Sequence, residues 1–336
     1  MSKITALMSV YNEENNIEET ISSILNQSFT DFEFIIVNDG STDKTEEIIR
    51  MFDDKRIRYF SFEENQGVGA ALHFGLSKAR GEYIAKVDAD DISRIDRFEM
   101  QLNYLLSNPY IDLVHSYVNY LSNEVSVLNS QRFKHLQSTY LNQIKRLSTP
   151  KDFSIAINWF CCIIHSTMMV RSHVATSISY SSDFRTGEDY DFFYRLNKLG
   201  CKIDIIPEPL VDVRVSLQST SVIETDMYVD IIYKIKTEDI SEFLLNNSYQ
   251  YLIWGTGLFG ETLFKKLRQR DYSIFGFIDS DRGKWDTQRC GLNTYSPSIL
   301  RKGKHKVIVA STTGRLEIVE VLKGQNFSFK EDFFVF

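Results

Sequence analysis

What this 336-residue chain lacks narrows its class before any motif is considered. Its four cysteines, Cys161, Cys162, Cys201 and Cys290, do not have the spacing of metal ligands, and adjacent cysteines rarely form a disulfide. We therefore expect a reduced, cytoplasmic protein. The net charge of −7 argues against a nucleic-acid binder, and it means that an anionic substrate needs a local cation.

Long apolar runs are also missing. No continuous apolar segment follows Lys3 before Glu13, so we expect no signal peptide. The stretch 153–170 carries no formal charge over 18 residues, but serine, asparagine, histidine and threonine interrupt it, and it is at the short limit for a membrane span. We predict that it is buried core.

The first expected strand–helix turn has no glycine. Residues 4–10 form an apolar run of strand length, and apolar residues at helical spacing begin at Ile17. A dinucleotide-binding domain would place G-x-G-x-x-G between them, so that bare backbone amides contact the pyrophosphate. Here the turn is Tyr11-Asn-Glu-Glu14, which can stack a base on Tyr11 but cannot cradle phosphate.

Strand and helix patterns alternate through the first ninety residues. Apolar runs at 4–10, 32–37, 56–62 and 83–87 are separated by segments with helical spacing. This alternation predicts an α/β protein with a doubly wound sheet and a nucleotide-sized crevice.

Three carboxylates, Asp88, Asp90 and Asp91, follow the run 83–87 directly. Ligands of open α/β sheets bind beyond the carboxyl ends of the strands, and crowded carboxylates there favour a cation among them. Oxygen ligands suit Mg²⁺ or Mn²⁺. Alone, the pattern fits equally well the N-cap of a helix that starts near Ser93.

Two further acidic segments have two readings each. Asp39 follows the second strand, where it can accept hydrogen bonds from a base or ribose, or serve as a turn residue beside Gly40. Glu188 and Asp189 fall in the first turn of an expected helix, where they complement the helix dipole or include a general base.

Four blocks of sequence together carry a family resemblance. They are Val10-Tyr-Asn-Glu-Glu14, Val37-Asn-Asp-Gly-Ser-Thr-Asp43, Asn65-Gln-Gly-Val-Gly69 and Gly81-Glu-Tyr-Ile-Ala-Lys-Val-Asp-Ala-Asp-Asp91. In this order and spacing, the chain resembles the family-2 glycosyltransferases over about residues 1 to 220. The resemblance implies a GT-A fold with a mixed sheet, an inverting reaction, a nucleotide-diphosphate sugar donor, and Mn²⁺ or Mg²⁺ as cofactor.

The resemblance also assigns roles in the first half of the chain. Tyr11 and Asp39 would hold the nucleobase, Asp88 would approach the ribose or donor sugar, and Asp90 would bind the metal. Within the same motifs, Val10, Glu13 and Ala89 are expected to border the donor. Arg97 matches a basic position after the metal motif, or it is a solvated helix arginine.

In the second half, the resemblance implies an acceptor side. The segment 158–171 would line the acceptor pocket, where His165 contacts a hydroxyl or, as we favour, is a satisfied and partly buried histidine. Asp189 would be the catalytic base, and Glu188 would position donor or acceptor. Arg214 would steady the diphosphate. Many relatives have a histidine two residues after this arginine, whereas this chain has Ser216.

The C-terminal part has the glycine turn that the N-terminal part lacks. We expect a glycosyltransferase domain at 1–222, a helical linker at 223–248 and a Rossmann-like domain at 249–336. Gly255, Gly257 and Gly260 open a helix there, and Asp279 ends the next strand, as in the dinucleotide fingerprint. This domain binds a nucleotide or sugar nucleotide, or it serves packing or dimerisation.

The main hypothesis is therefore an inverting, metal-dependent glycosyltransferase. It would move a sugar, expected from UDP, to a hydroxyl of a glycan in surface polysaccharide or lipopolysaccharide synthesis. A lipid-linked acceptor would bring the enzyme to the inner face of the cell membrane as a peripheral protein, for which the basic runs 145–146 and 265–270 are weak support. A homo-oligomer is compatible with the sequence. The alternatives are an NAD(P)-linked oxidoreductase that uses the C-terminal domain, and a non-catalytic sugar-nucleotide sensor.

Overall fold

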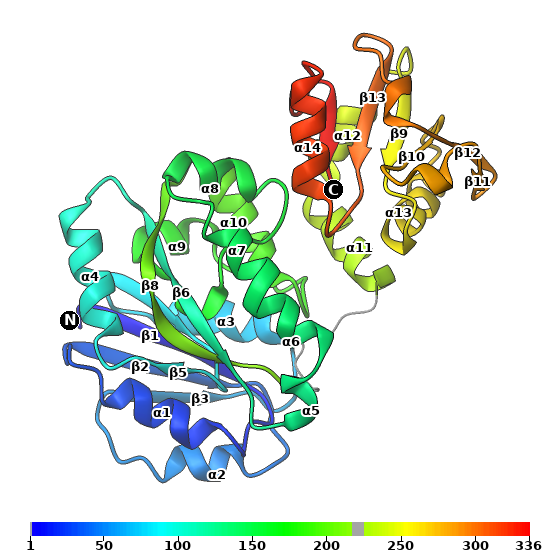
Figure 1. The fold of residues 1–336 in the computed structure, drawn as a ribbon. Coiled ribbons are helices and arrows are strands. Elements are labelled where there is room, and N and C mark those ends of the chain that lie inside the picture. The colour runs from blue at the N-terminus through cyan, green and yellow to red at the C-terminus, as the bar shows by residue number, and fades with distance from the viewer. Residues whose placement is uncertain (1, 217–224) are drawn as a thin grey trace. The chain divides into compact units, whose positions relative to one another are not determined.

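The computed structural model describes residues 2–216 and 225–336 of the chain (Figure 1). They divide into two compact units, Met1–Val222 and Ile223–Phe336, each with its own sheet.

The first unit is built on an eight-stranded mixed sheet of order β3-β2-β1-β4-β7-β6-β8-β5. β1, β2, β3 and β4 run parallel, whereas β7 is antiparallel to both β4 and β6, and β5 is antiparallel to β8. The α/β class and the mixed sheet are confirmed. The strands are β1 (Ile4–Val10), β2 (Phe32–Asn38), β3 (Ile57–Ser61), β4 (Tyr83–Val87), β5 (Ile92–Ser93), β6 (Leu113–Leu121), β7 (Met169–Arg171) and β8 (Ile203–Arg214).

Helices cover both faces of this sheet (Figure 1). They are α1 (Ile17–Leu25), α2 (Thr45–Arg50), α3 (Val68–Lys78), α4 (Arg97–Ser107), α5 (Val125–Leu128), α6 (Gln131–His135), the π-helical turn η1 (Leu136–Tyr140), α7 (Leu141–Ile144), α8 (Pro150–Ala156), the 3₁₀ turn η2 (His165–Thr167), α9 (Ser172–Ile178) and α10 (Glu188–Lys198).

The core follows from the alternation of side chains along the strands. Every second residue of β1, from Ile4 to Val10, packs with Ile17, Ile21 and Ile24 of α1 and with Phe98 of α4. The opposite face of the same strands meets α3, where a Cβ on Gly75 would contact the side chains of Leu7 and Val37. Since β1 and β4 are buried on both faces, their sequences are almost continuously apolar.

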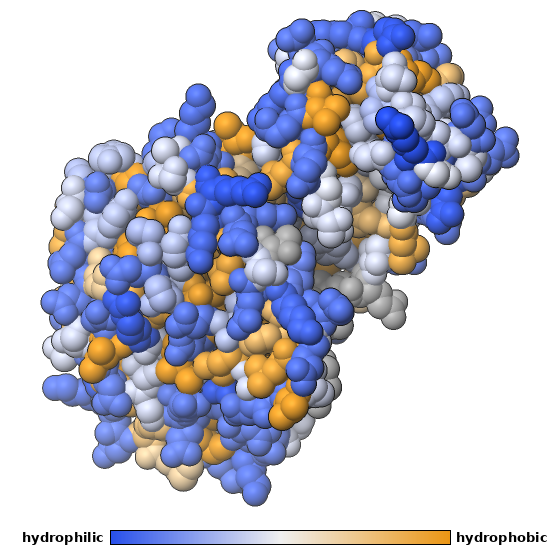
Figure 2. All heavy atoms as spheres, in the orientation of Figure 1, coloured by the Kyte–Doolittle hydropathy of each residue, from blue (hydrophilic) through white to orange (hydrophobic). Residues whose placement is uncertain are grey.

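The uncharged stretch 153–170 forms several short pieces. It contains the end of α8, the turn η2 and the start of β7, and Phe153, Ile163 and Met169 are buried. Among the described residues, no helix is both long and apolar enough to cross a bilayer. Figure 2 shows one face of the molecule, on which most residues are hydrophilic and the hydrophobic ones form small groups.

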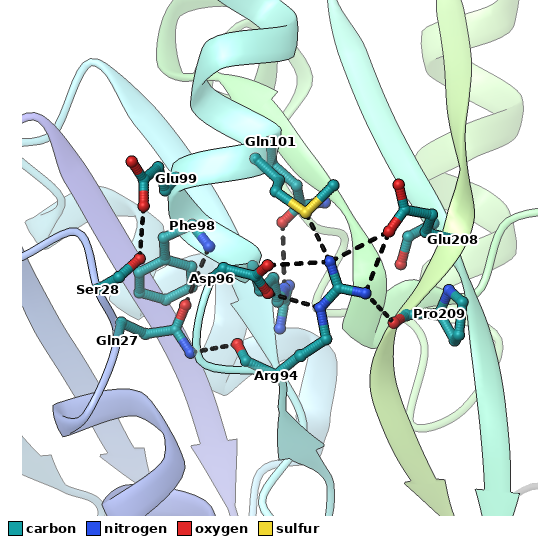
Figure 3. Close-up of polar contacts among 12 residues, drawn as sticks. Gln27, Ser28, Arg94, Asp96, Phe98, Glu99, Gln101, Glu208 and Pro209 are labelled. Atoms are coloured by element: carbon teal, nitrogen blue, oxygen red, sulfur yellow. Dashed lines mark hydrogen bonds and ion pairs between the residues drawn. The ribbon is translucent and has the colours of Figure 1, made fainter.

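The segment after β4 is held by side-chain hydrogen bonds and ion pairs with other elements (Figure 3). Gln27, which is 3% exposed, donates to the carbonyl of Arg94 (2.7 Å) and accepts from the amide of Phe98 (3.0 Å) in the first turn of α4. The Arg94 guanidinium binds both carboxylate oxygens of Asp96 and reaches Glu208 (3.3 Å) just before the middle of β8. This network fixes where α4 begins relative to α1 and β8.

The second unit has a six-stranded sheet of order β11-β12-β10-β9-β13-β14, parallel except for β11. Its strands are β9 (Gln250–Trp254), β10 (Gly276–Ile278), β11 (Gln288–Arg289), β12 (Leu292–Tyr295), β13 (His305–Val309) and β14 (Phe333–Val335). Its helices are α11 (Thr225–Ile235), α12 (Thr237–Leu244), α13 (Leu258–Arg268), η3 (Arg282–Lys284), η4 (Pro297–Ile299) and α14 (Arg315–Gly324).

The segment that we expected as a helical linker, 223–248, lies within this second unit. Buried Lys236 donates to the carbonyl of Val335 in β14 (3.1 Å), and the Tyr251 hydroxyl of β9 donates to the carbonyl of Phe243 (3.0 Å). The apolar sides of α11 and α12 are used in packing on this sheet, so the segment is part of a folded unit.

Replacing Gln27 by leucine should destabilise the first unit. The change leaves the buried amide of Phe98 without its acceptor, which costs about 1 to 3 kcal/mol. Hydrogen exchange of peptides that cover α4, compared with the wild type, measures this loss. Ser28→Ala removes a neighbouring but exposed hydrogen bond to Glu99 and should change stability by less than about 0.5 kcal/mol. Equal effects of the two changes would contradict the assigned role of Gln27.

Candidate active site

Parallel pairing brings the ends of three strands to one edge of the sheet. Val10 pairs with Asn38 at the ends of β1 and β2, and Met8 pairs with Val87 at the end of β4. The loops that carry Tyr11, Asp39 and the Asp88–Asp91 acids therefore open at the same edge, where ligands of such sheets bind.

Lys86 is the cation of this edge, and it was missed by the sequence reasoning. Its side chain is 1% exposed, its ammonium contacts an oxygen of Asp88, and it donates to the carbonyl of Val87 (2.8 Å). Enclosure by the protein would raise the pKa of Asp88, but the adjacent ammonium brings this pKa below its usual value. A lysine inside a strand whose other residues are apolar was the available signal.

Asp90 and Asp91 lie among other acids, and the neighbouring positive charge does not compensate their negative charges. Burial, together with the charges of Asp91, Asp88 and Glu13, raises the pKa of Asp90 to about 8. Burial and the charge of Asp88 raise the pKa of Asp91 to about 7. One oxygen of Asp91 accepts from the Arg214 amide (3.0 Å), whereas Oδ2 is buried without a hydrogen-bond partner among the described residues.

These residues fit a hard divalent cation. The available atoms are carboxylate oxygens, their negative charges raise one another's pKa, and a buried oxygen of Asp91 is unsatisfied. Within residues 2–216 and 225–336, no three His, Cys, Asp or Glu side chains already form a complete metal cage. One or two carboxylates completed by substrate phosphates are the usual way in which Mg²⁺ is held.

The loop at the end of β2 is ordered by Asp39. This residue is 2% exposed, and its carboxylate accepts from the amides of Gln66 (2.8 Å) and Gly67 (2.9 Å), the block that leads into α3. Burial raises its pKa, and the nearby positive charge of Arg185 opposes this rise. Arg185 was not foreseen, because it lies far away in the sequence before α10.

The other residues of the first blocks have simpler positions. Tyr11 is 44% exposed at the mouth of the site, as stacking of a base requires. Val10 and Ala89 are buried, and their carbonyls accept from the Asp39 amide (2.8 Å) and the Thr20 hydroxyl (3.0 Å), respectively. Glu13 accepts from the Asn16 side chain (3.0 Å), and burial raises its pKa.

Arg97 lies inside the protein, where other protein groups bind its guanidinium. It is 1% exposed, and its guanidinium donates to Gln101, Ser93 and the carbonyl of Lys86 (2.7 Å). Burial lowers its pKa to about 10. It therefore supports the end of β4 from inside the protein and is not a solvated helix arginine.

Arg214 is also held by protein groups. It donates to the carbonyl of Asp90 (3.1 Å) and pairs with Glu19 of α1 (2.7 Å), and its side chain is 8% exposed. These two contacts of Arg214 fix the acidic loop against α1. Ser216, the departure from the family pattern, follows at the end of β8, and its carbonyl accepts from Arg132 (3.2 Å).

The second acidic pair opens α10 after Gly187, whose φ of +83° turns the chain into the helix. Burial and the charge of Asp189 raise the pKa of Glu188 to about 8. The pKa of Asp189 is raised by burial and by Asp88. Asp189 accepts from the amide of Tyr190 (2.6 Å) and from the thiol of Cys161 (3.8 Å).

His165 links the two acidic groups. Its Nε2 hydrogen-bonds the Tyr180 hydroxyl (2.8 Å), and its Nδ1 is 3.9 Å from a carboxylate oxygen of Glu188. Burial lowers its pKa to about 3, so it is neutral, as a satisfied buried histidine would be. The charges of Lys86 and Asp88 act on both His165 and Glu188, which shows that β4 and α10 face one shared site.

The glycines and the acid of the C-terminal fingerprint also come together. Gly255 and Gly257 lie in the turn between β9 and α13, Gly260 lies in the first turn of α13, and Asp279 directly follows β10. The Asp279 carboxylate accepts from Thr256 and from Lys284 (3.1 Å) within the protein.

Loss of the Asp88 charge should destabilise the first unit. Asp88→Asn leaves buried Lys86 without its carboxylate, and we expect a cost of about 2 to 3 kcal/mol, since Asp88 itself is partly exposed. Urea unfolding in metal-free buffer measures it. Lys86→Met combined with Asp88→Asn should recover part of the loss, whereas Asp90→Asn, which relieves repulsion, should keep or raise stability. A cost for Asp90→Asn as large as that for Asp88→Asn would contradict this charge balance.

Known sequences match the two units separately. The family model described as Glycosyl transferase family 2 matches residues 5–176, and the model described as C2185-like, N-terminal, matches residues 247–331. The first match includes Asp88–Asp91 but ends before Glu188.

Related proteins carry glycosyltransferase names. An uncharacterised glycosyltransferase of Haemophilus influenzae is 33% identical over 248 residues, which is 72% of this chain and 74% of that protein. TuaG of Bacillus subtilis, a putative teichuronic acid biosynthesis glycosyltransferase, is 37% identical over 105 residues, or 31% of this chain and 42% of TuaG.

Solved structures share the GT-A fold of the first unit. S. aureus TarS in complex with UDP-GlcNAc aligns with a TM-score of 0.54 at 18% identity, over 71% of this chain and 66% of that one. The mannosyltransferase PcManGT from Pyrobaculum calidifontis, in complex with GDP-Man and Mn²⁺, aligns with a TM-score of 0.52 at 16% identity, over 71% and 64%. The chain thus spans about two thirds of these proteins. From the family match over half of its length, the chain belongs to glycosyl transferase family 2.

Proposed function

We propose that the protein is an inverting, metal-dependent glycosyltransferase that transfers a sugar from a nucleotide diphosphate to a glycan hydroxyl. The observation that carries this proposal is the meeting of two acidic groups at one edge of the sheet. The charge of Asp88 at the end of β4 raises the pKa of both Glu188 and Asp189 at the start of α10, so these acids face a shared site. One group suits a diphosphate–cation complex, and the other suits a base.

We propose UDP as the nucleotide of the donor. Exposed Tyr11 offers its ring to the base, and the loop that Asp39 orders lies beside it. TarS was solved with UDP and with UDP-GlcNAc, whereas PcManGT was solved with GDP-Man. The donor's base is therefore the first property to test.

Asp90, with Asp91 or Glu13 beside it, would hold Mn²⁺ or Mg²⁺. A divalent cation there supplies positive charge against the departing diphosphate. Lys86 supplies positive charge to Asp88. Its ammonium neutralises this carboxylate, which can still accept hydrogen bonds from ribose or sugar hydroxyls. Arg97 and Arg214 keep the acidic loop in position through its backbone.

Asp189 would act as the general base. Its carboxylate takes the proton of the acceptor hydroxyl while that oxygen forms a bond to the anomeric carbon, and the bond from this carbon to the diphosphate oxygen breaks with its electron pair. Attack opposite the leaving group inverts the anomeric centre. Burial and Asp88 raise the pKa of Asp189, which increases its affinity for the proton. His165, which is neutral, and Glu188 lie beside each other next to Asp189.

The proposed pathway is the synthesis of a surface glycan. Its support is the similarity to TuaG, whose name assigns it to teichuronic acid biosynthesis. A lipid-linked acceptor and peripheral contact with the inner face of a membrane stay predictions of the sequence, as does a homo-oligomer.

Asp189→Asn should lower the rate of sugar transfer by at least about 100-fold, since a general base contributes 10² to 10⁴. The affinity for UDP should stay within about twofold, because the change is isosteric and distant from the nucleotide. Single-turnover kinetics with the cognate donor, together with a UDP titration, measure both quantities. Unchanged turnover would rule out Asp189 as the base, whereas absence of turnover in the wild type with every donor would favour a sensor role.

Asp191→Asn provides the matched control on the same helix. Asp191 is buried and pairs with Arg195 (2.8 Å from Nε), so its loss should lower the melting temperature. The rate per folded molecule should stay within a fewfold of the wild type. A loss of turnover equal to that of Asp189→Asn would show that any acid of this helical turn is needed for the fold of the site.

Nucleoside diphosphates with Mn²⁺ should stabilise the protein against heat. A ligand at 100 times its dissociation constant contributes about 2.7 kcal/mol to the unit that binds it. Thermal unfolding with UDP, GDP, dTDP and CDP, each with Mn²⁺ or with EDTA, identifies the base. The shift in unfolding of the first unit should require Mn²⁺ and vanish in Asp90→Asn, but persist in Asp53→Asn, which removes an exposed carboxylate. A shift of this unit that is the same in EDTA would overturn the metal assignment.

A further inference from the structure

The second unit contains a cavity that the transfer reaction does not use. It has a volume of about 770 Å³ and lies beyond the carboxyl ends of β9, β10 and β13, where Thr256, Gly257, Ser280, Lys284, Ser311 and Thr313 contribute to its lining. A volume of this size is that of a drug-sized or nucleotide-sized site. Its position beyond the ends of parallel strands is where α/β sheets bind ligands.

The three glycines of the fingerprint beside this cavity have different surroundings. A Cβ on Gly255, whose φ is +130°, would collide with the carbonyl of Ala310 in the next strand, and a Cβ on Gly260 would collide with the carbonyl of Gly255. These two glycines permit close packing of the turn. Gly257 is different, because a Cβ there would meet no protein atom within 4 Å. The fold does not need a glycine at this position, so the open space above it is available to a ligand.

The charges around this space favour an anion. Gly257 precedes the first residue of α13, and Gly314 precedes the first residue of α14, so two helices begin at the cavity with amides that have no partner within the helix. The side chain of Lys284, which is 47% exposed, also lines the cavity. Asp279 does not oppose an anion strongly, because Thr256, Lys284 and the amide of Asp281 already bind its carboxylate.

The remaining lining is apolar and aromatic. Trp254, Phe259 and Tyr228 border the cavity, and the rings of Tyr228 and Phe259 lie 5.9 Å apart. Inorganic phosphate would leave most of the volume and this apolar wall unused. A ligand with a phosphate at one end and a flat apolar group at the other would use both.

We propose that the second unit binds a nucleotide, with its phosphates above Gly257 between Lys284 and the 311–314 loop and its base toward the aromatic wall. A nucleotide sugar and a dinucleotide share this chemistry. The usual contact of a dinucleotide's ribose with the acid after the second strand would have to compete here with Thr256 and Lys284 for Asp279. The inference is independent of the transfer reaction proposed for the first unit.

Tryptophan fluorescence of the full chain can report on this site alone. Of the three tryptophans, Trp254 lines the cavity and Trp285 donates to the carbonyl of Asp279 (2.8 Å), whereas Trp159 belongs to the first unit. In a Trp159→Phe background, titration with UDP, UDP-GlcNAc, ADP, NAD⁺ and NADP⁺ should give a saturable change with at least one of them. UDP compounds and adenine compounds thereby distinguish the two sources of the ligand.

Two variants and two controls test the geometry. Lys284→Met should weaken binding about tenfold through the lost charge. Gly257→Val should abolish binding, because its side chain fills the phosphate space without touching the protein. Gly324→Val, at another glycine whose Cβ would meet nothing within 4 Å, should bind as the parent does. Asp90→Asn, in the first unit, should also leave binding unchanged.

The proposal fails if no nucleotide changes the emission, or if Gly257→Val binds as tightly as the parent protein. Binding of inorganic phosphate as tight as that of every nucleotide would also overturn it, since the base would then contribute nothing.

Discussion

The balance of charge at the end of β4 is the constraint on which the rest of the first unit depends. The charges of Glu13, Asp88 and Asp91 raise the pKa of Asp90, and the buried ammonium of Lys86 lowers the pKa of Asp88. Such a cluster costs stability unless cations or hydrogen bonds compensate it. The neighbouring structure is arranged to supply part of this compensation and to leave the rest for a ligand.

Several buried polar side chains hold this cluster through the backbone. Arg97 binds the carbonyl of Lys86, Arg214 binds the carbonyl of Asp90, and Asp39 orders the loop before α3 through two amides. Since their charges are used inside the protein, they fix the loops without filling the site. This explains how residues that resemble ligand contacts in the sequence serve as its supports in the structure.

The two units place their ligand-binding features by the same topological rule but with opposite chemistry. Both have parallel strands whose carboxyl ends open at one edge. In the first unit acids follow these strands, which suits the cation-dependent binding of a diphosphate that we propose. In the second unit a glycine turn, two helix starts and Lys284 follow them, so that an anion can be bound directly.

The sequence by itself determined the elements and the family. β1, α1, β2, α3, β4 and α10 could be predicted because burial on both faces makes strands continuously apolar and burial on one face gives helices their period. Only the tertiary structure decided which polar residues face the site. Asn16 is an example: it lies at the N-cap position of α1, but its side chain donates to Glu13 and makes no cap. Arg97 was expected at the donor or as a solvated helix arginine and is buried, Lys86 lies within a recognised motif but was given no role, and Arg185 acts on Asp39 from a position outside the motifs. Periodicity records which face of an element is apolar, whereas the direction of a polar side chain depends on partners that are distant in the chain.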